Sequence, residues 1–153
     1  MGHRSLRCAL GRGGVSALKR EGDGATPLAA MRLLHGYFRP GRLAKAGMRH
    51  SLRRITPELG WCDSPGDRNY NRPVPLPYDH SHERMMRADR LYDAVIVLDW
   101  NVKPRRRNKG SAIFLHVARP GYPPTEGCVA IAPRDMAWLL RHVSPRTVLR
   151  VEG

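Results

Sequence analysis

Short apolar runs separated by turn-forming residues are the main pattern along the chain. The clearest run is Ala94–Leu98, which is uninterrupted and rich in β-branched side chains. Two shorter runs, Ala112–Leu115 and Val129–Ile131, are bounded by Gly or Pro. Runs of this length, flanked by turn residues, are typical of buried strands and too short for buried helices. We therefore predict a sheet of short strands, with Ala94–Leu98 at its centre.

A helical period appears only late in the chain. Met136, Leu139, Leu140 and Val143 lie on one face of a helix that begins at Pro133. The segment 147–151 after it predicts a closing edge strand. Together the patterns predict a mainly β fold, a sandwich or barrel-like arrangement of short strands with one helix, in a single domain over residues 1–153.

Composition sets the class of partner. Hydrophobic residues make up 41% of the 153 residues, which supports a core. Twenty-seven basic against 13 acidic residues give a formal charge of +14, which favours an anionic partner: nucleic acid is the usual first choice, and polyanionic cell-wall material fits equally well. No apolar segment is long enough to predict a membrane span. Residues 1–10 lack the apolar centre of a secretion signal.

One histidine and one cysteine occupy the rims of two short predicted strands. His116 follows the first run, and Cys128 precedes the second across a short loop rich in Gly and Pro. An imidazole beside a thiol can activate it as a nucleophile. Gly127 allows a sharp turn, and main-chain N–H groups there could bind an oxyanion. The alternative is that His116 caps a strand and that Cys128 is a small buried apolar residue.

The segment around these residues resembles the active-site signature of the YkuD-type L,D-transpeptidases. Thr125, Gly127 and Cys128 match the family's Ser/Thr-His-Gly-Cys element, and His116 matches its upstream histidine. The resemblance implies Cys128 as nucleophile, His116 as general base and acid, Thr125 as the residue that orients the imidazole, and Gly127 as an oxyanion-hole backbone.

Three features depart from the family pattern. Glu126 replaces a histidine, Ala130 replaces an arginine thought to contact the substrate, and the loop between His116 and Cys128 is shorter than usual. The nucleophile and the base are retained. These departures concern the choice of donor substrate, so Glu126 is included among the candidate substrate-binding residues.

The resemblance extends over most of the chain from about Cys8. The stretch 19–27 is similar to the family's Thr-Pro turn, with Ala29 in place of the usual glycine. The stretch 60–84 is similar to a proteobacterial subgroup. The resemblance also implies an extended strand over Leu28–Phe38, where the apolar pattern alone fits neither period.

The middle of the chain supplies the other candidate substrate-binding residues. We predict a long loop over 55–77, dense in hydrogen-bonding side chains that suit a peptide and its carboxylates. A rigid polar loop that satisfies its own hydrogen bonds is the alternative. Beyond it, Ser81 could cap a helix, and His82 could line the cleft or bind a metal ion. The candidates are Arg68, Asn69, Tyr70, Asn71, His82 and Glu83.

The remaining patterns predict surface structure and free thiols. Residues 39–54 read as a basic hairpin exposed to solvent, and Lys103–Lys109 as the cationic tip between two antiparallel strands. Cys8 and Cys62 could pair in an oxidising compartment, although two unpaired thiols fit better. The Cys and His spacings match no metal motif, so we expect no metal ion and no cofactor.

These observations predict a cysteine acyltransferase that crosslinks peptidoglycan stem peptides through a thioester, giving 3-3 or 1-3 links. Its partners would be donor and acceptor stems, with no nucleic acid, and the resemblance implies the periplasm or cell envelope. The alternatives are an L,D-carboxypeptidase or amidase that trims stems, and a non-catalytic basic module that binds wall polymer or nucleic acid.

Overall fold

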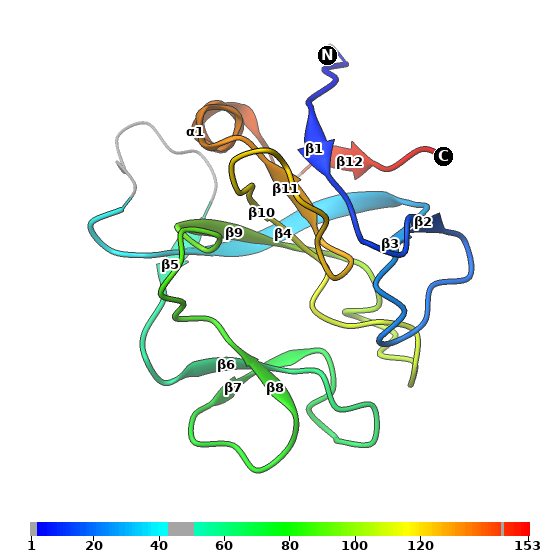
Figure 1. Cartoon of the computed structure of the whole chain (residues 1–153). Coiled ribbons are helices and arrows are strands. Elements are labelled where there is room, and N and C mark those ends of the chain that lie inside the picture. Colours follow the sequence, from blue (N-terminus) through cyan, green and yellow to red (C-terminus); the bar gives the residue numbers. More distant parts are fainter. Residues whose placement is uncertain (1–2, 43–50, 145) are drawn as a thin grey trace.

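The structure, a computed structural model, describes residues 3–42, 51–144 and 146–153, and within them it is mainly β with one helix (Figure 1). This confirms the predicted fold class. The elements in chain order are β1 Cys8–Ala9, β2 Val15–Ser16, β3 Thr26–Pro27, β4 Ala30–Phe38, β5 Leu52–Arg54, β6 Leu59–Cys62, β7 Arg72–Pro75, β8 His82–Arg84, β9 Ala94–Leu98, β10 Phe114–Val117, β11 Val129–Ile131, α1 Pro133–His142 and β12 Val148–Arg150.

The largest sheet has the order β1-β11-β10-β9-β4-β12, with β5 also paired to β4. The predicted central strand β9 lies between β10 and β4 and pairs with both in an antiparallel manner. Strands β10 and β11 pair in parallel, with His116 opposite Ala130. The sheet therefore brings the histidine strand and the strand after the cysteine side by side, as predicted.

The two faces of this sheet are covered by different layers. On one face Leu115 and Ile131 pack against Met136 and Leu140 of α1. On the other face Phe114 packs in a cluster with Trp61, Val95, Val97 and Met85. Because both faces are buried at the inner strands, β9 and β11 read as continuous apolar runs without polar alternation.

The second layer is a three-stranded sheet, β7-β6-β8, where the sequence predicted a loop and a helix. Residues 55–77 are not one long loop, because β6 pairs with β7 around a turn that includes Asn71 at φ 56°. The helix expected at Ser81 is also wrong. Residues 82–84 are β8 on the other side of β6, since the inner strand needs a backbone partner on each edge.

The helix and the flanking strands follow the predicted order. Helix α1 begins at Pro133 and ends at His142, with Asp135 in its first turn and basic residues in its last, which suits the helix dipole. The extended segment over 28–38 is confirmed as β4, which pairs with the closing edge strand β12. No described helix is long and apolar enough to cross a membrane.

The basic segment 39–54 is not the predicted hairpin where the structure describes it. Strand β5 pairs with β4 in parallel, and parallel neighbours cannot be joined by a tight hairpin. Residues 43–50 lie outside the described residues. Cys8, Cys62 and Cys128 are all free thiols.

Candidate active site

Parallel pairing places the thiol and the imidazole on one face of the main sheet. Leu115 is opposite Val129 and His116 is opposite Ala130, so Cys128 stands opposite Phe114. Side chains alternate along a strand. Leu115 and Val129 face the helix, so His116 and Cys128 share the opposite face, where Cys128 packs against the cluster that includes Phe114.

The Cys128 thiol is bonded to main-chain groups. It donates to the Ala112 carbonyl at 3.2 Å, and the Phe114 N–H donates to the sulfur at 3.4 Å. Burial and, to a smaller extent, the nearby Glu83 carboxylate together raise the pKa of the thiol to about 12. The resting Cys128 side chain is therefore a neutral thiol.

His116 is 4% exposed and is held by the chain beside it. Its Nδ1 lies 2.9 Å from the Val117 carbonyl, which can only accept, so Nδ1 carries the proton and Nε2 carries the lone pair. Burial lowers the pKa of the imidazole to about 4. The resting imidazole is therefore neutral and has a free lone pair on Nε2, which can accept a proton.

The Thr125–Cys128 turn is fastened by its own hydroxyl and by the N-terminal segment. Thr125 Oγ1 accepts from the Gly127 N–H at 3.1 Å and donates to the Cys128 carbonyl at 2.7 Å. The main-chain groups of Thr125 bond Leu10 and Arg12. The bond that holds the His116 ring thus comes from Val117, and the expected contact from Thr125 to the imidazole is not among these bonds.

Position 127 requires a glycine, both because of its backbone conformation and because the Ala25 main chain lies close to it. Its φ is 131°, a conformation that side-chain-bearing residues rarely adopt, and a Cβ would meet the Ala25 carbonyl oxygen at 2.8 Å. Any larger residue would push residue 25 away from the turn. The glycine before the nucleophile therefore allows the Thr26 segment to pack against the turn, where the Thr26 hydroxyl donates to the Cys128 carbonyl at 3.4 Å.

A charged cluster borders the imidazole on the same face. The Tyr92 hydroxyl donates to the Glu83 carboxylate, and the Tyr92 ring meets the His116 ring edge-on at 5.5 Å. Arg87 lies 3.7 Å from Glu83 and forms a two-bond pair with Asp89 at 2.8 and 2.9 Å. Burial raises the pKa of Glu83, while the Arg87 hydrogen bonds lower that of Asp89 to about 2.

Of the predicted substrate-binding residues, Glu83 is the one that this cluster places beside the thiol and the imidazole. Tyr92, Arg87 and Asp89 were not predicted. No spacing in the sequence distinguishes them, because they reach the site from the segment between β8 and β9 only once the second sheet has formed.

Asn71 is buried, at 1% exposure, and it stabilises the backbone segment that contacts Cys128. Its Oδ1 accepts from Trp61 Nε1 and from the Ala112 N–H, each at 3.0 Å, and its Nδ2 donates to the Trp100 carbonyl at 3.2 Å. Ala112 has φ 51° and supplies the carbonyl that binds the thiol. Asn71 therefore fixes the backbone that holds Cys128.

Tyr70 helps to stabilise the segment around Ala112 through Glu21. Its hydroxyl donates to the Glu21 carboxylate, which also accepts from the Ser111 hydroxyl at 2.8 Å. Burial raises the pKa of Tyr70 well above its usual range, and the hydrogen bond to Glu21 raises it further. Glu21 and Ser111 join the candidate site as supports that the sequence patterns did not indicate.

The other predicted substrate-binding residues form their bonds with groups other than Cys128 and His116. Asn69 donates to the Tyr78 hydroxyl at 3.0 Å, and His82 Nδ1 bonds the His80 carbonyl at 2.8 Å. Glu126 forms an exposed ion pair with Arg12 at 2.8 Å. Arg68 lines a separate cavity. Among the described residues, no hydrogen bond or ion pair links these four to Cys128 or His116.

The residue at position 130 cannot be a substrate-binding cation here. Ala130 is 2% exposed and packs with Ala9 and Ala118 where β1 pairs with β11. Within the described part of the chain, no group of three or more His, Cys, Asp or Glu residues is placed to hold a metal ion.

A neutral thiol and a neutral imidazole lie on the same face of adjacent strands, inside a two-layer β fold, and an imidazole near a thiol can activate it as a nucleophile. The family comparison agrees: the family model of the L,D-transpeptidase catalytic domain, YkuD, matches residues 2–151. The chain belongs to this family. Neither the search of curated proteins nor the search of solved structures found a match.

Proposed function

We propose that this protein is a peptidoglycan L,D-transpeptidase that carries the acyl group on Cys128 as a thioester. The observation that supports this most directly is the shared sheet face of Cys128 and His116, within a family domain that spans nearly the whole chain. The domain assigns the chain to the L,D-transpeptidases, whose substrate is peptidoglycan. The nucleophile, the bond cut and the products are our proposal.

The neutral resting state favours general-base catalysis over a preformed ion pair. The thiol leaves the Ala112 carbonyl, and His116 Nε2 takes its proton as the sulfur attacks a carbonyl carbon of the donor stem. The tetrahedral intermediate collapses, the C–N bond breaks, and the imidazolium returns the proton to the leaving amine. The products are the thioester and the released amine.

The second half-reaction reverses these roles. An amine of an acceptor stem attacks the thioester while His116 accepts its proton, and the thiol is regenerated with that proton. A new amide, the crosslink, is released. If water attacks in place of the amine, the product is a trimmed stem carboxylate.

The oxyanion forms next to the Thr125–Cys128 turn. The Gly127 N–H already donates to the Thr125 hydroxyl, so it must share or exchange this bond if it is to bind the oxyanion. The Thr125 hydroxyl keeps the turn closed by donating to the Cys128 carbonyl. We propose that this preformed turn presents main-chain donors to the developing negative charge.

The buried Ala130 bears on which donor bond is cut. Without a cation at this position, the donor carboxylate must be bound elsewhere, and Arg87, which lies 3.7 Å from Glu83 in the cluster beside His116, is a candidate for this role. We propose a donor cut after its diamino acid, which gives 3-3 links. Cleavage of the L-Ala to D-Glu bond, which gives 1-3 links, is the second candidate, since the family arginine is replaced. The site of action is the cell envelope, where these stems are found.

The test is to incubate the purified chain with disaccharide-tetrapeptide muropeptides and to determine the products by mass and fragmentation. Crosslinked dimers support the proposal, and the fragment linkage separates 3-3 from 1-3 chemistry. Shortened monomers alone would make the protein a stem-trimming hydrolase. No product under reducing conditions, together with salt-sensitive polyanion binding, would make it a non-catalytic basic module.

A further inference from the structure

The loop Lys103–Lys109 gathers five basic side chains within seven residues. Among the ion pairs formed by residues 3–42, 51–144 and 146–153, none includes a side chain of this loop. Like charges this close repel one another, and water screens that repulsion only in part. The fold thus leaves this charge unneutralised by its own acids.

The loop is held in one shape despite this repulsion. The Asn101 amide donates to the carbonyls of Arg106 and Gly110 at 2.9 and 3.0 Å and accepts from the Arg106 N–H at 2.8 Å. Trp100 Nε1 donates to the Lys109 carbonyl at 2.7 Å. A preformed arrangement loses less conformational entropy when it binds a ligand.

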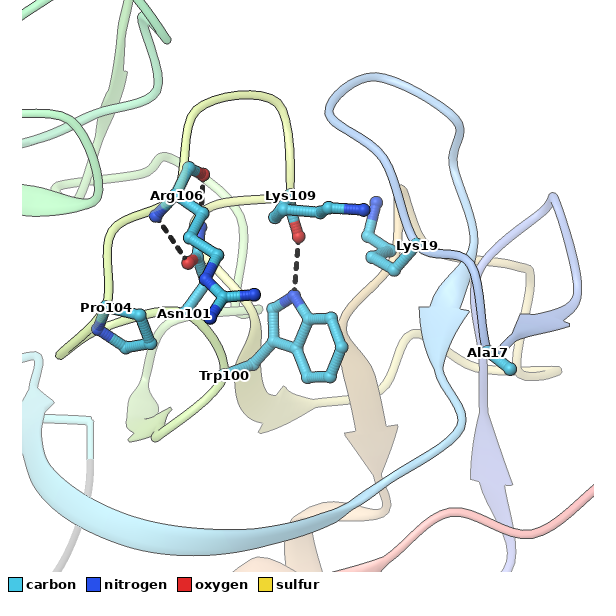
Figure 2. Close-up of a pocket in the computed structure, with 7 residues that line it drawn as sticks. All are labelled: Ala17, Lys19, Trp100, Asn101, Pro104, Arg106 and Lys109. Atoms are coloured by element: carbon cyan, nitrogen blue, oxygen red, sulfur yellow. Dashed lines mark hydrogen bonds between the residues drawn. The ribbon is translucent and has the colours of Figure 1, made fainter.

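Two neighbouring cavities flank the loop, and Pro104 lines both. One, of about 230 Å³, is lined by cations from two segments: Arg68, Arg105 and Arg107. The other, of about 280 Å³, contains Arg106 and Lys109 above the Trp100 indole (Figure 2). The loop therefore contributes cations to both cavities.

Asp67, which lines the first cavity, and Asp23, which pairs with Lys19 of the second, are both already bonded. Asp67 accepts from the Tyr78 hydroxyl at 2.7 Å and the Asn69 N–H at 2.6 Å, and His80 lies 3.2 Å away. Asp23 binds the buried Lys19 ammonium at 2.5 Å, so Lys19 is matched within the second cavity. The loop cations form no ion pair among the described residues, and Arg105 donates one hydrogen bond, at 3.3 Å, to the Arg68 carbonyl, so these cations can still bind an outside anion.

The loop also leads directly to the nucleophile. Its last residue is followed by Gly110, Ser111 and Ala112, and the Ala112 carbonyl accepts the Cys128 thiol. Glu21 fixes Ser111, and the Glu21 N–H donates to the Asn108 carbonyl. A ligand bound to the loop is thereby placed beside the segment that holds the thiol.

We propose that the Lys103–Lys109 loop binds the carboxylates of an acidic peptide, and, resting on the proposed function, that this peptide is the acceptor stem that resolves the thioester. Arginine forks match planar carboxylates in a bidentate manner. Two small cavities on either side of the loop suit spaced carboxylates better than a single-stranded nucleic acid, whose backbone follows a continuous basic groove. In the two cavities, Trp100 and Tyr70 are the aromatic lining residues.

The experiment compares the wild type with Arg105→Gln/Arg107→Gln and with a control of equal charge change, Arg141→Gln/Arg146→Gln. Both control arginines are exposed and lie at and after the end of α1. The first readout is binding of a fluorescent tri-glutamate peptide and of its fully amidated form, with inorganic polyphosphate as a separate arm. The second readout is the KM for an acceptor tetrapeptide stem with the donor saturating, together with the rate at which the acyl adduct forms.

The proposal predicts that the loop variant weakens tri-glutamate binding and raises the acceptor KM by about tenfold, with an unchanged rate of adduct formation, while the control changes each by less than about twofold. The amidated peptide should bind weakly to every variant. Equal effects of loop and control, or no effect of either, would overturn the proposal, and so would polyphosphate as the only ligand that binds through the loop.

The outcome also separates this inference from the proposed function. If the wild type forms no adduct but its tri-glutamate binding still depends on Arg105 and Arg107, the transpeptidase proposal fails and the carboxylate site stands. If adducts and crosslinks form with an acceptor KM that is insensitive to the loop, the transpeptidase stands and the acceptor site is wrong.

Discussion

The Lys103–Lys109 loop is separated from the strand that carries His116 by only a few residues, yet the loop and the Cys128–His116 pair differ in charge. Around Cys128 and His116, burial raises the thiol pKa to about 12 and lowers the imidazole pKa to about 4, so both groups are neutral. In the loop, five cations are mostly exposed and unpaired among the described residues. Proton transfer benefits from groups that water does not solvate, whereas attraction of an anion requires charge that solvent can reach.

The largest expected effect comes from removing the imidazole that we propose as the base. We expect His116→Gln to slow formation of the acyl adduct by about a thousandfold, since general-base assistance contributes about 10² to 10⁴-fold. The measurement is single-turnover acylation followed by intact mass. His142→Gln, on α1, is the matched control. A rate within tenfold of wild type for His116→Gln would remove the imidazole from the reaction.

Replacing Asn71 tests whether its hydrogen bonds stabilise the buried segment that holds Cys128. Asn71→Ala would leave Trp61 Nε1 and the Ala112 N–H without their acceptor, and we expect a loss of about 3 kcal/mol of unfolding free energy together with slower acylation. Urea unfolding measures the first effect. Asn69→Ala is the control, because its amide bonds the hydroxyl of Tyr78 in a partly exposed site. Equal losses for the two variants would contradict a specific role for Asn71.

The neutral imidazole predicts an unusual acid limit. Acylation requires unprotonated His116, and the folded pKa of about 4 lies below the ordinary value of 6.5, so activity should persist as pH falls to about 5 and then decline near 4. Stability follows the same window. The unfolded chain binds the proton first, so the contribution of His116 to stability is complete above 6.5 and falls as the pH drops from 6.5 towards 4.

The measurement is the pH profile of the acylation rate at low substrate, with urea unfolding at matched pH values. An acid limb near 6.5 would show that the imidazole is solvated and that the active site lacks the low-dielectric character we describe.

The smallest effect belongs to the exposed Arg12–Glu126 pair. Glu126 is 78% exposed, and exposed pairs contribute at most about 1 kcal/mol, so Glu126→Gln should change the unfolding free energy by about 0.5 kcal/mol or less. Thermal and urea unfolding at low and high salt measure this. A large, salt-independent loss would mean that position 126 is bonded within the folded turn itself.

The parts of the fold that the sequence predicts are those whose pattern is local. Strand β9 is a continuous apolar run, and α1 combines Pro133 with a helical period, so each is visible within its own segment. The three-stranded sheet was missed because residues 59–62 find their partners only in space, and polar neighbours such as Asn71 hid the strand ends.

The candidate site divides in the same way. Cys128 and His116 could be predicted because each lies at the rim of an apolar run, next to a glycine-containing turn. The residues that surround and stabilise this pair could not be predicted. Asn71 reads as a polar loop residue until Trp61 and Ala112 are folded against it, and Tyr92 gains its neighbour Glu83 only through the second sheet.

The most direct test of the account is the mass of the protein during turnover. Wild type and Cys128→Ala are incubated with a tetrapeptide donor under reducing conditions, quenched in acid and digested, and the modified peptide is sequenced by fragmentation. We expect a thioester adduct on Cys128 in the wild type and none in the variant. An adduct on Cys8 or Cys62, or crosslinked product from Cys128→Ala, would contradict it.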